Sequence, residues 1–92
     1  MKLFTDSTGN TKTISGFFES KCEDMISSST GDDAQNVVRR IHLSMSEIVG
    51  IHETLNFLEV VTIKESDYLW KLYQSALEES RSNFICKFGQ QL

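Results

Sequence analysis

The feature that most constrains the fold is the long stretch from Ala34 to Val61, which carries no turn signal in a chain without proline. Its apolar residues are separated by three, four or seven positions, the spacing that places side chains on one face of an α-helix. Asp32 and Asp33 precede the stretch and suit the positive N-terminal end of a helix. The pattern predicts one long helix over 33–61. Its apolar face comprises Val38, Ile41, Met45, Ile48, Leu55 and Leu58.

A second long amphipathic stretch follows almost at once. Thr62 and Glu65 fit the capping box of a helix start, and the β-branched residues around Thr62 weaken the helix before it. Lys87 suits the negative C-terminal end of a helix, and Gly89 suits the position just after it. We therefore expect a helix over 63–87. Its apolar face comprises Leu69, Trp70, Tyr73, Leu77, Phe84, Ile85 and Phe88.

A shorter helix is expected over 16–28. Ser15 suits its N-cap, and the serine-rich run that leads to Gly31 ends it. Residues 1–14 hold a dense cluster of turn formers between flanks rich in Thr and large apolar residues. They predict a short β-hairpin or an extended arm.

The length of 92 residues allows one hydrophobic core, so we expect a single domain over 1–92. The predicted fold is mainly α: a hairpin or arm, then three helices, the last two forming a long antiparallel helical hairpin. Gly50 lies in the middle of the long helix and indicates a bend or a close helix crossing. Residues 90–92 are expected to be a frayed tail.

Charge and composition exclude some classes of function. The net charge of −4 is mildly acidic and disfavours direct binding to nucleic acid. Cys22 and Cys86 are interpreted as small buried hydrophobes in a reducing compartment, with a disulfide between them as the alternative. There is no signal-peptide pattern, and no apolar run approaches the ~20 residues that span a bilayer. We expect a cytoplasmic protein that has no membrane partner.

The relative lengths of the helices suggest spare apolar surface. The first predicted helix is about half as long as the other two, so it cannot cover both. Part of the apolar surface of the hairpin is then left over, which indicates a homodimer or a groove for a partner protein. Catalysis and cofactor binding are not expected, because no nucleophile motif or phosphate-binding loop is recognisable.

His52 and Tyr68 are candidate binding residues. His52 fills a step in the apolar face of the long helix, where a half-buried histidine with one satisfied hydrogen bond is the usual finding. A role in specificity or switching at a helix interface is the alternative. A metal site is not expected, because the chain lacks the Glu-x-x-His pairs of helical metal bundles. Tyr68 points away from the other aromatic residues of its helix and is a candidate interface anchor.

The charged candidates indicate nucleic-acid functions of two kinds. Arg39 and Arg40 form the one basic doublet. On a helix such a doublet is most often a solvated face, and on a recognition helix it would contact DNA. Four acids from separate helices could join into one negative surface that imitates a phosphate backbone: Asp32, Asp33, Glu78 and Glu79.

These observations favour a small protein-binding module, a regulator or inhibitor of the kind found among phage accessory proteins, which covers a surface of its partner. An acidic nucleic-acid mimic that blocks a DNA-binding protein is the first alternative. DNA binding through Arg39 and Arg40 is the second.

Overall fold

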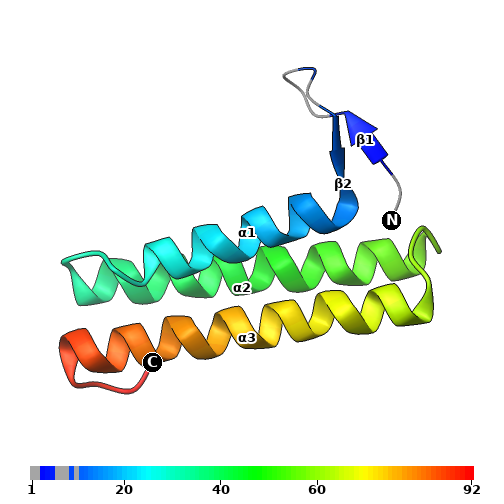
Figure 1. Cartoon of the computed structure of the whole chain (residues 1–92). Helices are drawn as coiled ribbons and strands as arrows, with labels where there is room; N and C mark the ends of the chain where they lie inside the picture. The colour runs from blue at the N-terminus through cyan, green and yellow to red at the C-terminus, as the bar shows by residue number, and fades with distance from the viewer. Residues whose placement is uncertain (1–2, 6–8, 10) are drawn as a thin grey trace.

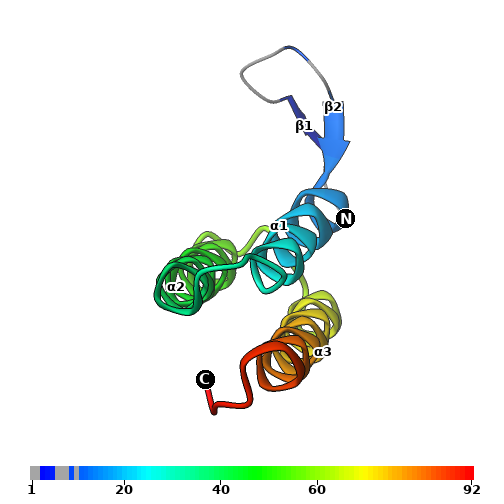
Figure 2. The ribbon, with the colours of Figure 1, turned by 90° about the vertical axis from the view of Figure 1, so that its left-hand side faces the viewer.

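The computed structural model describes residues 3–5, 9 and 11–92. Most of this part of the chain lies in three helices, α1 (Ile14–Ser28), α2 (Ala34–Phe57) and α3 (Ile63–Phe88). Figure 1 shows the helices side by side, with successive helices running in opposite directions. In the end-on view of Figure 2 they form a triangle, and each packs against the other two. The predicted mainly α-helical domain with three helices is confirmed.

Two short strands precede the helices. β1 (Leu3–Thr5) pairs antiparallel with β2 (Thr11–Thr13), with Phe4 opposite Lys12. Residues 1–2, 6–8 and 10 lie outside the described residues. The hairpin or arm expected over 1–14 therefore stays a prediction.

All three helices contribute to one core. Among the described residues every buried polar side-chain atom has a hydrogen-bond partner, such as the Ser80 hydroxyl, which donates to the Ala76 carbonyl at 2.8 Å. The buried apolar residues are Ile14, Phe18, Cys22 and Met25 from α1, Val37, Ile41 and Ile48 from α2, and Leu69, Tyr73, Ala76 and Phe84 from α3.

The structure confirms most of the predicted helix ends and corrects one N-cap. Asp33 caps α2, and Thr62 with Glu65 forms the capping box of α3. Gly89 ends α3 in the left-handed region, at φ 65°. However, α1 starts at Ile14 and is capped by Thr13 instead of Ser15. The Thr13 hydroxyl accepts a hydrogen bond from the Gly16 backbone N–H at 3.0 Å and so satisfies an N–H at the helix start.

The predicted end of the long helix at residue 61 is wrong, because α2 ends at Phe57. Glu59 adopts a left-handed conformation with φ 55°. Its backbone N–H donates to the Asn56 carbonyl at 3.1 Å, and the Val60 N–H donates to the Leu55 carbonyl at 3.2 Å. These two bonds make up a Schellman motif, which satisfies the last carbonyls of α2 and turns the chain.

Several residues on the predicted apolar faces are not buried. Leu58 is exposed because it lies past the end of α2, where α1 does not reach (Figure 1). Phe84 is buried and Phe88 partly buried, whereas Ile85 and Cys86 are exposed. Each residue advances about 100° around a helix, so Ile85 and Cys86 turn away from the side that Phe84 and Phe88 occupy.

Three further expectations change. Val37 is fully buried instead of Val38, which is partly buried. A Cβ atom added at Gly50 would meet nothing within 4 Å, so Gly50 does not mark a close helix crossing. Leu92 packs against the core cluster, so the predicted frayed tail over 90–92 is wrong at its last residue.

Candidate functional site

The most exposed large apolar side chains gather around the turn between α2 and α3. Phe57 is 85% exposed, Leu58 59% and Ile63 90%. Phe57 is the last residue of α2, Leu58 caps it, and Ile63 is the first residue of α3. We call this part of the molecule, residues 57–63, the open end. In Figure 1 the tips of α2 and α3 extend beyond the start of α1, which leaves the open end without a third helix to cover it.

A groove runs between α2 and α3 from the open end. We call it the α2–α3 groove, and it has a volume of about 450 Å³. Its walls are partly apolar and partly acidic, and they contain one histidine and one tryptophan. The lining residues are Val49, His52 and Glu53 from α2 and Ile63, Ser66, Asp67 and Trp70 from α3.

His52 joins the two walls of this groove. Its Nε2 lies 3.0 Å from the Ser66 carbonyl oxygen and 3.1 Å from the Ser66 hydroxyl. Because a carbonyl oxygen only accepts, Nε2 carries the hydrogen and donates it. The other ring nitrogen, Nδ1, is then an acceptor and lies 3.5 Å from the Asn56 amide nitrogen. His52 is therefore half-buried with its hydrogen bonds made, and it fixes the spacing of α2 and α3.

Trp70 lies beside His52 in a cluster of tilted aromatic rings. The Trp70 ring centroid is 5.0 Å from that of His52 and 5.0 Å from that of Tyr73. Tyr73 is buried, whereas Trp70 is only half-buried and lines the groove. The sequence placed both residues in the core, which is right for Tyr73 and only partly right for Trp70.

The charges of the α2–α3 groove are negative. Asp67 pairs with Lys71 one helical turn later, at 3.1 Å, and both side chains are largely exposed. Glu53 forms no ion pair or hydrogen bond with the residues that the structure describes. Neither lysine nor arginine lines the groove.

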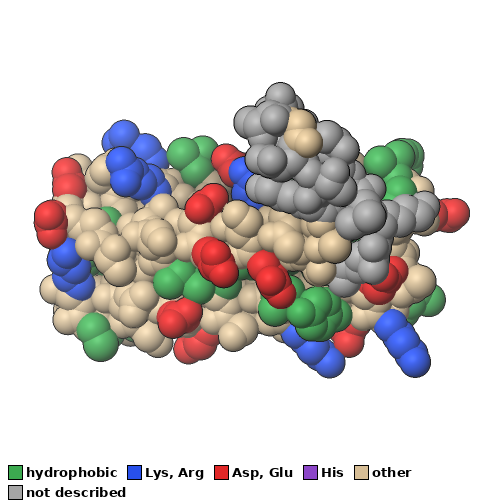
Figure 3. Space-filling model, turned by 45° about the horizontal axis from the view of Figure 1, so that its top comes forward, with side chains coloured by type: hydrophobic (Ala, Val, Ile, Leu, Met, Phe, Trp, Pro, Cys, Tyr) green, Lys and Arg blue, Asp and Glu red, His purple; other side chains and the backbone are tan. Residues whose placement is uncertain are grey.

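A second hollow lies between α1 and α3 and is more acidic. It contains three carboxylates over a floor that includes the Cys22 thiol. Burial, and after it the charges of Glu19 and Glu23, raise the pKa of Cys22 to about 11. Figure 3 shows acidic side chains in the middle of this face and at both of its ends, while most Lys and Arg side chains lie nearer its ends. The lining residues are Glu19, Cys22, Glu23, Ile26, Leu72, Ser75, Ala76 and Glu79.

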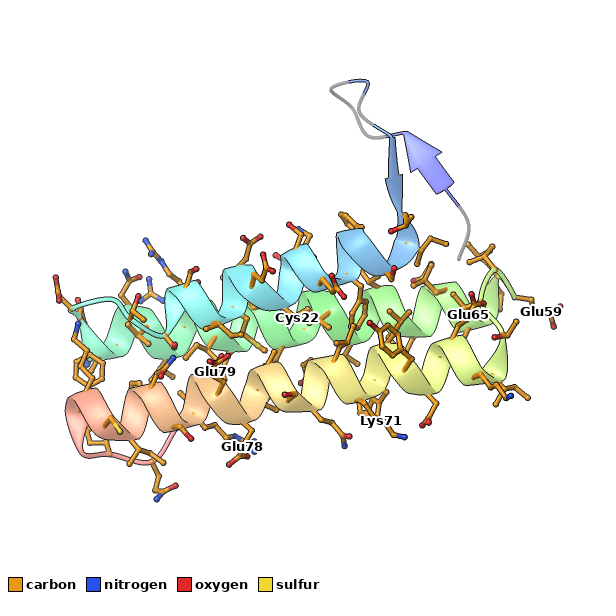
Figure 4. All side chains as sticks on the ribbon, viewed as in Figure 1. Cys22, Glu59, Glu65, Lys71, Glu78 and Glu79 are labelled. Carbon is orange, nitrogen blue, oxygen red and sulfur yellow. The ribbon has the colours of Figure 1, made fainter. Side chains whose placement is uncertain are left out.

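The structure does not bring together the four acids that the sequence proposed as a phosphate-like surface. Asp32 pairs with Lys87 at 2.8 Å, and Asp33 accepts hydrogen bonds from the first turn of α2. Glu79 points toward α1, whereas Glu78 points away from it (Figure 4).

The other candidate residues also lie apart. Tyr68 is 47% exposed, and its hydroxyl donates to the Glu19 carboxylate at 3.3 Å, so it belongs to the α1–α3 side and not to the groove of His52. Arg39 and Arg40 are exposed on the first half of α2. Whether any of these residues contacts a partner stays a prediction.

Sequence reasoning missed Phe57, Ile63, Glu53 and Asp67. The sequence did contain a signal for Phe57 and Ile63. They are apolar residues on both sides of a helix–helix turn, and such residues have nothing to pack against unless another element covers them. Extending the long helix to residue 61 hid this signal. Glu53 and Asp67 become neighbours of one groove only when α2 and α3 are placed relative to each other.

Comparison with known proteins adds no relative: no protein-family model matches the sequence, and no curated protein or solved structure matches it. Within the described part of the chain, none of the helices combines the length and apolar character needed to cross a membrane. The same residues contain no group of three or more His, Cys, Asp or Glu side chains arranged to hold a metal ion.

Proposed function

We propose that this chain is a small protein-binding module, a regulator or inhibitor that covers a surface of its partner with the open end. The observation that carries the proposal is the exposure of Phe57, Leu58 and Ile63 at one place in the fold. Clustered apolar side chains on a domain surface mark interaction sites, whereas scattered ones are ordinary. The chain acts in this proposal by occupation of a surface and not by catalysis.

The test is affinity capture from a bacterial lysate treated with nuclease, washed first at low and then at high salt. The wild-type chain is compared with a Phe57→Ser/Ile63→Ser variant and with a control, Leu43→Ser. Leu43 is also exposed, at 57%, but lies on α2 roughly 20 Å along the helix from Phe57. Circular dichroism and thermal unfolding verify that all three chains are folded.

The proposal expects one protein that wild type and the Leu43 variant retain through high salt and the double variant loses. Apolar contacts of this kind are nearly indifferent to salt. Retention of the same protein by the double variant would overturn the proposal. Sedimentation of the free chain tests self-association, since concentration-dependent dimers that the double variant loses would identify a second copy as the occupant.

An acidic nucleic-acid mimic is the second candidate, and the α1–α3 hollow favours it. Its carboxylates, Glu19, Glu23 and Glu79, replace the four acids chosen from the sequence as the group to change. A Glu19→Gln/Glu23→Gln/Glu79→Gln variant would lose a DNA-binding partner that wild type holds at low salt and releases at moderate salt. Loss of binding in the Phe57→Ser/Ile63→Ser variant alone would count against this candidate.

DNA binding through Arg39 and Arg40 is the least favoured function. A recognition helix packs steeply across the helix before it, so that its first turn enters the major groove. In Figures 1 and 2, α1 and α2 lie side by side along the same bundle axis.

A further inference from the structure

We propose that the α2–α3 groove binds an arginine or lysine side chain of the partner protein, while apolar neighbours of that residue pack on the open end. The inference rests on the proposed function and assigns the chemistry of the segment that the open end recognises. The occupant is a partner segment in which one basic residue stands among large apolar ones.

The walls of the groove fit a long basic side chain. Val49 and Ile63 offer apolar surface to its methylene stem. Lysine and arginine commonly pack their stems along such surface while the charged head stays in a polar environment. Trp70, half-buried in the same wall, offers an aromatic surface to the cationic head, and tryptophan is the best aromatic partner for such a head. An uncharged apolar residue would contact the apolar surface but would gain no cation–π interaction with Trp70.

The charges of the groove favour a cation over any other occupant. Two carboxylates, Glu53 and Asp67, line the groove together with neither lysine nor arginine. Glu53 has no charged or hydrogen-bonding partner among the described residues. Asp67 is held by Lys71, but exposed pairs of neighbouring helix residues are weak and exchange readily.

The hydrogen bonds within the groove point the same way. His52 directs its Nε2 hydrogen to the Ser66 carbonyl, so this donor is already used by the fold. An incoming anion would meet two carboxylates, whereas an incoming guanidinium or ammonium group would find acceptors in both of them.

The groove also adjoins the open end directly, because Ile63 belongs to both. A partner residue seated over Trp70 therefore has apolar surface beside it for its sequence neighbours. This continuity is the reason that we assign one mixed segment and not two separate ligands.

The experiment uses a short acetylated peptide amide in which one arginine stands between leucines. The reference peptide replaces arginine by citrulline, which has nearly the same shape and no charge. Binding is followed by the fluorescence of Trp70, the single tryptophan of the chain, and by backbone amide shifts in NMR spectra. We expect the arginine peptide to bind about tenfold more tightly at low salt, with the largest shifts along the groove.

A matched pair of variants tests the role of the carboxylates. Glu53→Gln/Asp67→Asn removes the two charges of the groove, and Asp24→Asn/Glu78→Gln removes two exposed charges elsewhere on α1 and α3. We expect the first variant to lose the preference for arginine over citrulline and the second to keep it. All four side chains are exposed, and unfolding curves verify that both variants remain folded.

Three results of the peptide experiment would overturn the inference. They are equal affinity for the two peptides, an unchanged arginine preference in the Glu53→Gln/Asp67→Asn variant, and amide shifts confined to another face. Capture of a partner that needs Phe57 and Ile63 but not the groove carboxylates would overturn it as well and leave the proposed function standing. Capture that needs neither Phe57 and Ile63 nor the groove carboxylates would overturn the proposed function too.

Discussion

The two ends of the helical bundle are built in different ways. At the end opposite the open end, the α1–α2 loop is bound by the last turns of α3. The Lys87 ammonium donates to the Thr30 carbonyl at 3.0 Å and to the Asp32 carboxylate at 2.8 Å, and the Asn83 amide donates to the Ser29 hydroxyl at 3.0 Å. We call this the closed end.

At the open end, the turn is formed by local hydrogen bonds. The turn from α2 to α3 is made by the Schellman motif around Glu59 and by the capping box of Thr62 and Glu65, which join residues at most five positions apart. Its large apolar side chains, Phe57 and Ile63 above all, face solvent.

The difference shows which surface is buried on folding and which stays exposed. Ser29 at the closed end is fully buried and bonded to Asn83, 54 positions later, so this bond of the loop depends on the packing of α3. At the open end, Phe57, Leu58 and Ile63 bury little area and so contribute little to the free energy of folding. Apolar surface that folding does not need is available for binding.

The largest expected effect comes from a test that replaces one phenylalanine from each end by alanine. Phe84, toward the closed end, is 1% exposed and packs against Phe88 with ring centroids 4.9 Å apart. Removal of a buried ring leaves a cavity, so Phe84→Ala should lower the free energy of unfolding by about 3–5 kcal/mol. Phe57→Ala should change it by no more than about 0.5 kcal/mol, as expected for an exposed position.

Urea unfolding followed by circular dichroism measures both changes, and an unchanged slope with urea verifies that the variants unfold like wild type. A loss of several kcal/mol in Phe57→Ala would contradict the comparison. It would mean that the open end is part of the folding core.

A smaller effect is expected from the two left-handed residues that end the long helices. The chain turns out of α3 at Gly89, with φ 65°, and out of α2 at Glu59, two residues after Phe57, with φ 55°. A residue with a Cβ atom pays roughly 1–2 kcal/mol for the left-handed conformation, and glycine does not. Glu59→Gly should therefore stabilise the protein by about 0.5–1 kcal/mol, and Gly89→Ala should destabilise it by about 1 kcal/mol.

Thermal unfolding of the two variants measures these opposite changes. In Figure 4 the Glu59 side chain points away from the bundle, so the substitution removes no packing. Destabilisation by Glu59→Gly would show that the side chain has a structural role that the described contacts do not reveal.

Much of the helical fold could be predicted because helix starts and ends depend on a few neighbouring residues. Thr62 with Glu65, Asp33 and Gly89 all occupy the helix-end positions that the sequence assigned to them. The end of α2 was missed for the same local reason. Glutamate rarely adopts the left-handed conformation, so nothing in the sequence marks Glu59 as the residue that ends a helix.

The candidate site was less accessible to prediction. Helical spacing identifies the inward face of each helix, and it placed Tyr73, Ile48 and Phe84 correctly. It does not say how two helices are placed relative to each other, and this placement is what brings Glu53 and Asp67 to one groove. His52 was singled out from the sequence, but its partner Ser66 was not.

The smallest expected effect concerns the ion pair of the closed end and depends on pH. The hydrogen bond from Lys87, and then its charge, hold the pKa of Asp32 below its ordinary value of 3.8. A lowered carboxyl pKa stabilises the folded state at pH values above the ordinary pKa, and this stabilisation is lost as the pH falls through the folded value. Asp32→Asn should therefore be slightly less stable than wild type near neutral pH and equal to it once Asp32 is protonated.

Lys87→Met separates the ion pair from the other bond that Lys87 makes. The variant loses the hydrogen bond to the Thr30 carbonyl as well, and that bond does not involve the Asp32 carboxylate, so the difference from wild type should persist below pH 3.8. NMR titration should also show the pKa of Asp32 rising toward 3.8 in this variant. Because the pair is exposed, added salt should reduce the neutral-pH difference for Asp32→Asn. A difference for Asp32→Asn that survives both acid and salt would mean that the closed end is held by the shape of its loop and not by this charge.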